Sequence, residues 1–268
     1  RNRRFARATD AFDDLVAELI AERRGATEGG EPAGDDLLSL LLSVEFDDGS
    51  RMSDRQLRDH LVTFLFAGHE TSSLALSYAL LLLARHPEEA DRLRAEVADV
   101  AGDGPLRTAH VRELAFTERV LKETLRRYPP ANVLFREPTE PTTVGGYRID
   151  PGTTITLPSF RIHNDARWYD DPESFRPDRW TDGMETDLPD YAYFPFGGGP
   201  RHCIGMRFAM LETKLALATF VRRWEFDLRS DPEPAFAAAA TMRPTEEIRL
   251  RVRARRAGSN RRTASSGT

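Results

Sequence analysis

The feature that most constrains this chain is a stretch from Ser53 to about residue 85 in which nothing breaks a helical pattern. Ser53 and Gln56 have the spacing of a capping box at its start, and Pro87 follows its end. A helix of about 30 residues would be roughly 45 Å long, so we expect it to cross the whole molecule. His69 and Glu70 interrupt its apolar run, which argues against a membrane span.

The predicted fold class is mainly α with small β-sheets (α+β). Shorter helices are predicted at residues 10–24, 37–44, 88–100, 108–113, 117–128 and 205–222, and strands in a hairpin over 142–157 and at 224–228 and 248–252. Residues 158–195 are rich in Pro, Gly and aromatics without periodicity, which is typical of a functional loop. We expect one domain over residues 1–252, followed by a disordered Arg/Ser-rich tail at 253–268.

The composition excludes several classes of protein. Hydrophobic residues make up 40% of the 268 positions, which permits a sizeable core and excludes global disorder. The net charge of −5, from 38 basic and 43 acidic side chains, gives no signal for nucleic-acid binding. A single cysteine excludes an internal disulfide framework. The chain begins with Arg1, so it is expected to start inside a longer protein or after a processing event, and the lack of a visible targeting segment decides nothing about location. A cytoplasmic location is expected, with a membrane anchor at the true N-terminus left open.

The one cysteine, Cys203, lies in the segment F-G-G-G-P-R-H-C-I-G. A lone cysteine is most often a small buried apolar residue, but the glycines before it suit a backbone wrapped closely around a ligand. Arg201, His202 and the predicted helix start that follows would all favour a thiolate. Without a second cysteine or a neighbouring base, a thiolate is a poor protease nucleophile and a good single axial ligand for iron.

This segment resembles the haem-binding loop of the cytochrome P450 family, F-x-x-G-x-R-x-C-x-G. The matching residues are Phe196, Gly199, Arg201, Cys203 and Gly205. The resemblance implies that they bind haem b, with Cys203 as the axial iron ligand. It also implies that Arg201 holds a haem propionate, as does an arginine shortly after the Pro129-Pro130 pair, Arg136.

The segment Ala67-Gly68-His69-Glu70-Thr71 resembles the family's oxygen-binding helix. It could instead be a packed core helix in which Thr71 bonds back to a carbonyl. However, Gly68 in mid-helix costs about 1 kcal/mol relative to Ala, and Ala67, Gly68 and Thr71 share one face. The resemblance implies that Ala67 and Gly68 contact the cofactor, and that Glu70 and Thr71 are the catalytic acid and alcohol that deliver protons.

Two further short segments together predict a structural network. Glu123 and Arg126 match the family's E-x-x-R, and F-R-P-D-R-W resembles its P-E-R-F segment, with Asp178 and Trp180 in place of Glu and Phe. The resemblance implies that Arg179 of the second segment pairs with the first, which would hold the irregular segment against the core.

The implied activity is that of a haem-thiolate monooxygenase acting with O2 on a small hydrophobic substrate. Electrons would come from a ferredoxin or a flavoprotein reductase, and a cluster of Arg201, His202, Arg207 and Lys214 would suit an acidic donor. The resemblance also implies a helical N-terminal portion that this chain lacks.

Two alternatives remain open. A peroxide-driven or isomerising haem-thiolate enzyme would not need Glu70 and Thr71, so these residues count against it. A truncated, non-catalytic haem-binding or partner-binding fragment is the second alternative.

Overall fold

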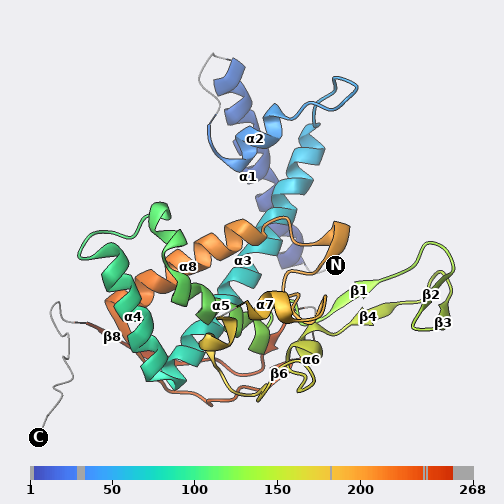
Figure 1. Ribbon diagram of the computed structural model, residues 1–268. Coiled ribbons are helices and arrows are strands. Elements are labelled where there is room, and N and C mark those ends of the chain that lie inside the picture. The colour runs from blue at the N-terminus through green and yellow to red at the C-terminus, as the bar shows by residue number, and fades with distance from the viewer. Residues whose placement is uncertain (1–2, 29–33, 182, 238, 240, 256–268) are drawn as a thin grey trace, which may run out of the picture. The chain divides into compact units, whose positions relative to one another are not determined.

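The chain divides into two compact units, and the long helix contributes residues to both of them (Figure 1). The computed structural model describes residues 3–28, 34–181, 183–237, 239 and 241–255. The first unit is Arg1–Glu70 and the second is Thr71–Thr268. The predicted helix is confirmed as α3, Asp54–Arg85, which has 32 residues. In the described residues, no helix combines the length and the apolar character that crossing a membrane requires.

The first unit contains α1 (Arg3–Glu28), α2 (Leu37–Ser43) and the beginning of α3. The predicted capping box is present, because the Ser53 N–H donates to Gln56 Oε1 at 2.9 Å and the Gln56 N–H donates to Ser53 Oγ at 3.4 Å. The small core of this unit is formed by Val16, Ile20 and Leu57. The capping box thus satisfies the N–H of Gln56 in the first turn of α3, which has no partner within the helix.

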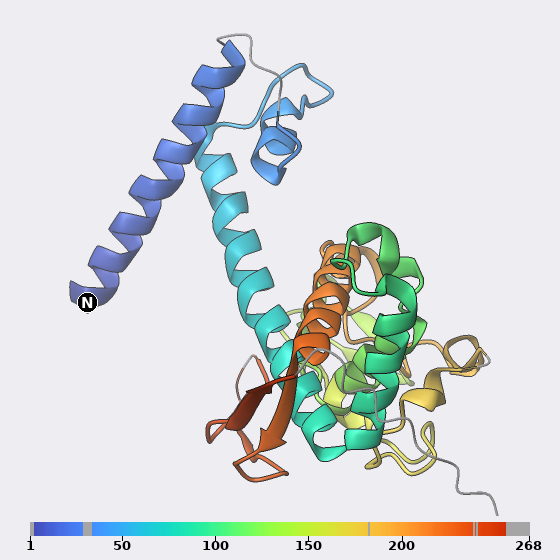
Figure 2. The same cartoon turned by 90° about the vertical axis from the view of Figure 1, so that its left-hand side faces the viewer.

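The second unit is built on a layer of helices. Helices α4 (Pro87–Ala101), α5 (Ala115–Arg127) and α8 (Met206–Arg223) contact one another (Figure 2). The 3-10 helix η1 (Thr108–Arg112) joins α4 to α5. The core that these helices share with the end of α3 includes Tyr78, Leu82, Leu93, Val97, Leu121, Leu217 and Val221.

Short antiparallel ribbons flank these helices. Strand β1 (Leu134–Arg136) pairs with β4 (Ile155–Leu157), and β2 (Thr142–Val144) pairs with β3 (Tyr147–Ile149) at the outer end of that ribbon (Figure 1). Near the C-terminus, β5 (Trp224–Leu228) pairs with β8 (Leu250–Ala254), and β6 (Phe236–Ala237) pairs with β7 (Arg243–Pro244). The irregular segment contains the short helices α6 (Ser159–His163), η2 (Pro177–Trp180), α7 (Met184–Asp187) and η3 (Gly199–Arg201).

Two strand predictions differ from the structure. The expected hairpin over 142–157 is divided, because β4 pairs with β1, whose three residues are too few to show a periodic pattern. Strand β8 extends to Ala254 because Ala254 and Arg253 pair with the first two residues of β5. The predicted tail therefore contributes two residues to a strand, and its residues 256–268 lie outside the described part of the chain.

Candidate functional site

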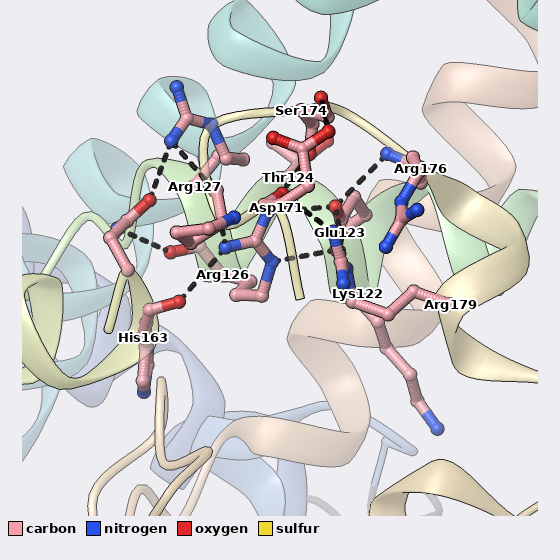
Figure 3. Close-up of polar contacts among 12 residues, drawn as sticks. Lys122, Glu123, Thr124, Arg126, Arg127, His163, Asp171, Ser174, Arg176 and Arg179 are labelled. Atoms are coloured by element: carbon pink, nitrogen blue, oxygen red, sulfur yellow. Dashed lines mark hydrogen bonds and ion pairs between the residues drawn. The ribbon is translucent and has the colours of Figure 1, made fainter. Parts of the chain in front are cut away.

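A buried ion network joins α5 to the irregular segment that precedes the cysteine (Figure 3). Glu123 and Arg126 lie one turn apart, and both side chains are fully buried. The Glu123 carboxylate accepts hydrogen bonds from Arg126 Nε and Nη2, each at 2.9 Å, and from Arg179 Nε at 3.4 Å. Arg126 also donates to the backbone carbonyls of His163, Pro172 and Ser174. The structure thus brings the expected trio together, with partners for each buried charge.

Trp180 is a further member of this network that the sequence motif did not reveal. Its indole Nε1 donates to Glu123 Oε2 at 2.9 Å, and the backbone N–H of Arg176 donates to Glu123 Oε1 at 3.0 Å. The available signal was the Trp in place of Phe in F-R-P-D-R-W, because an indole donates a hydrogen bond and a phenyl ring does not.

His163 connects the network to the chain that enters the cysteine loop. Its ring is fully buried at the end of α6, and its Nε2 accepts a hydrogen bond from the Phe194 N–H at 2.9 Å. Burial lowers the pKa of His163 from 6.5 to about 3, so the ring stays neutral, as an accepting nitrogen requires. His163 therefore positions the backbone two residues before Phe196.

The cysteine loop leaves its thiol exposed. Cys203 lies shortly before α8, and its N–H donates to the Phe196 carbonyl at 2.8 Å, which closes the loop. Gly199 has φ +66°, a conformation that side chains disfavour. A Cβ added to Gly198 would overlap the Tyr191 ring. Glycine at these two positions lets the chain turn tightly in front of the cysteine.

Two large apolar side chains close to the thiol in the sequence are exposed. Ile204 and Phe208 are 83% and 69% exposed, unusually high values for large apolar side chains. Gly205 lies between them, and a Cβ there would come within 3.9 Å of Cys203 Sγ. An exposed thiol with apolar neighbours suits a flat, largely hydrophobic ligand such as haem.

Two arginines are available for the anionic groups of such a ligand. Arg201 and Arg136 are both exposed, and neither forms an ion pair with a carboxylate of the described residues. Strand β1, which carries Arg136, lies against the loop, because a Cβ at Gly197 would be 3.5 Å from Leu134 Cδ1. The residues present therefore fit a haem with two propionates.

Residues 67–71, which resemble the oxygen-binding motif, lie in the middle of α3, and the helix continues through Gly68. Ala67 and Gly68 are exposed, and Glu70 and Thr71 are half-buried. Ala67, Gly68 and Glu70 belong to the first compact unit, whereas Thr71 and the cysteine loop belong to the second.

Lys214 does not belong to the expected basic surface. Its side chain is 5% exposed, and its Nζ lies 2.8 Å from Glu118 Oε2. Arg201, His202 and Arg207 are exposed, as expected. Lys214 is buried because it lies two turns beyond Arg207, where α5 packs against α8.

Comparisons with known proteins agree with the motifs and the fold. The family model described as Cytochrome P450 matches residues 1–252. A putative cytochrome P450 137 of Mycobacterium tuberculosis is 39% identical over 249 residues, covering 92% of this chain and 49% of that protein. Cyclooctatin synthase of Streptomyces melanosporofaciens is 39% identical over 223 residues, covering 83% of this chain and 48% of that protein.

The solved structures give the same result. The crystal structure of cytochrome P450DA heme domain matches with a TM-score of 0.82 and 36% identity, covering 91% of this chain and 54% of that chain. This chain spans about half the length of the curated relatives that it matches. The cysteine-loop and E-x-x-R motifs, the fold and these similarities together show that the chain belongs to the cytochrome P450 family.

Proposed function

We propose that the protein is a haem-thiolate monooxygenase that inserts one oxygen atom of O2 into a small hydrophobic substrate. The observation that carries this proposal is the exposed thiol of the one cysteine, held by a closed, glycine-containing loop shortly before α8. When bound, haem supplies the one-electron and O2 chemistry, and the protein supplies binding, orientation and electrostatics.

The chain's own residues would divide these tasks. The Cys203 thiolate would be the axial iron ligand of haem b, and the exposed Arg201 and Arg136 would neutralise the propionates. Phe196, Gly199 and Gly205 would shape the loop face of the cofactor site, and Ala67 and Gly68 would line its α3 face. Apolar side chains such as Ile204 and Phe208 would exclude water from the haem.

Glu70 and Thr71 would deliver protons to the ligand bound at the haem. A carboxylic acid followed by an alcohol on consecutive residues of α3 can pass a proton from solvent to a ligand at the helix face. The electron donor would be a separate protein, a ferredoxin or a flavoprotein reductase. The exposed Arg207 and His202 would favour an acidic donor, and a cytoplasmic location would suit either one.

The test is the carbon-monoxide difference spectrum of the reduced full-length protein. We expect the thiolate-type band in the wild-type protein and its loss in Cys203→Ser, because a hydroxyl does not replace a thiolate ligand. Arg207→Gln is the matched control, since it removes an exposed charge from α8 and leaves the cysteine loop intact, and it should keep the band. A thiolate-type spectrum in Cys203→Ser would refute the assignment. A normal spectrum without O2-dependent product formation would instead favour the non-catalytic fragment.

A further inference from the structure

The ends of α3 and α5 border an open pocket of about 390 Å³ that the proposed reaction does not use. Residues 173–176 complete its wall. Its lining includes Arg85, Arg127, Arg176 and His86, but only one carboxylate, that of Glu173. None of the residues assigned to the haem lines this pocket. Three arginines face one carboxylate, so the lining of the pocket carries a net positive charge.

Arg127 is the unusual member of this lining. Its Nη1 donates to Asn164 Oδ1 at 2.6 Å and to the Pro172 carbonyl at 3.0 Å, and both acceptors are neutral (Figure 3). Its Nε is buried without a hydrogen-bond partner, and no ion pair joins it to a carboxylate in the described part of the chain. Burial lowers the pKa of Arg127, as expected for a guanidinium that has lost solvent without gaining a counter-charge.

The other two arginines form ion pairs only with exposed carboxylates of the described residues, and Arg176 also donates to the Asp170 carbonyl at 2.9 Å. Arg85 pairs at 3.2 Å with Glu233, whose side chain is 76% exposed. Arg176 lies 3.8 Å from the carboxylate of Asp170, whose side chain is 96% exposed. Ion pairs with such exposed carboxylates are weak, so both guanidinium groups can turn to a ligand in the pocket.

We propose that this pocket binds an oxyanion of the phosphate class. Arg127 would supply the partly buried charge that lacks a counter-ion, and Arg85 and Arg176 would bind from the rim. The planar guanidinium fork matches phosphate oxygens, and such charge-assisted hydrogen bonds are strong. The phosphoryl group could be free phosphate or part of a phosphorylated small molecule, since both present the same oxygens.

The experiment is calorimetric titration of the full-length protein with inorganic phosphate and with pyrophosphate at constant ionic strength. We expect saturable binding that Arg127→Met weakens by about tenfold or more, as the loss of a charge-assisted contact predicts. Arg176→Gln should weaken binding by a smaller factor. Arg167→Gln is the matched control, because it removes an exposed arginine that pairs with Asp165 outside the pocket, and it should leave the affinity unchanged.

A second measurement keeps the test decisive if Arg127→Met folds poorly. Phosphate should raise the thermal midpoint of the wild-type protein above that in potassium chloride of equal ionic strength. The same rise should be reduced in both Arg176→Gln and Arg85→Gln. Saturable binding of pyrophosphate alone would support the site and assign it to a phosphorylated molecule. Binding of neither anion, or equal affinity in wild type and Arg127→Met, would overturn the proposal.

Discussion

At the scale of single residues, Trp180 gives Glu123 a hydrogen bond that a phenylalanine could not. Trp180→Phe removes the donor 2.9 Å from Glu123 Oε2 but keeps an aromatic ring beside Tyr193. A hydrogen bond to a charged group contributes about 1.5–3 kcal/mol, so the free energy of unfolding in urea should fall by about that amount. Trp168→Phe is the control, because its indole makes no hydrogen bond among the described residues, and it should cost less than about 0.5 kcal/mol. Equal losses in the two variants would contradict the role of Trp180.

At the scale of elements, α8 is tied to α5 by Lys214 and Glu118, which also lies 3.3 Å from Lys122. The cost of breaking this pair depends on which partner stays. Glu118→Gln strands the buried Lys214 ammonium, so we expect a loss of about 2–3 kcal/mol in unfolding free energy. Lys214→Met leaves a carboxylate that is 41% exposed and should cost about 1 kcal/mol or less. Glu185→Gln, which removes an exposed partner of Lys122, is the control. A larger loss in Lys214→Met than in Glu118→Gln would refute this asymmetry.

At the scale of the whole molecule, His163 makes stability depend on pH. Its pKa is about 3 in the folded protein against 6.5 as the ordinary value. Between these values the unfolded chain binds one more proton, so the free energy of unfolding falls as the pH is lowered from 6.5 toward 3. In His163→Gln, whose amide oxygen can still accept from Phe194, this slope should be shallower by up to about 1.4 kcal/mol per pH unit. Urea denaturation between pH 7.5 and 4.5 measures both slopes. Parallel slopes would show that His163 does not titrate on unfolding.

Much of the helical architecture and the cysteine loop could be predicted because their signals are local. The capping box of Ser53 and Gln56 spans four residues, and the apolar run behind it has no breaker before Pro87. The cysteine motif places five fixed positions within ten residues, so it is recognisable without any knowledge of tertiary contacts. The same holds for the pair Glu123 and Arg126, one helical turn apart.

The remaining features depend on residues that are distant in the sequence. Strand β1 exists because it pairs with β4, some twenty positions later, and Lys214 is buried because α5 covers that part of α8. Trp180 reaches Glu123 across 57 positions, and His163 accepts from Phe194 across 31. The sequence by itself determined the main helices and which residue carries the thiol, but not the short helices within residues 158–195. Only the tertiary structure decided which charges are buried and paired, because burial is a property of the neighbours that folding brings together and not of the local chain.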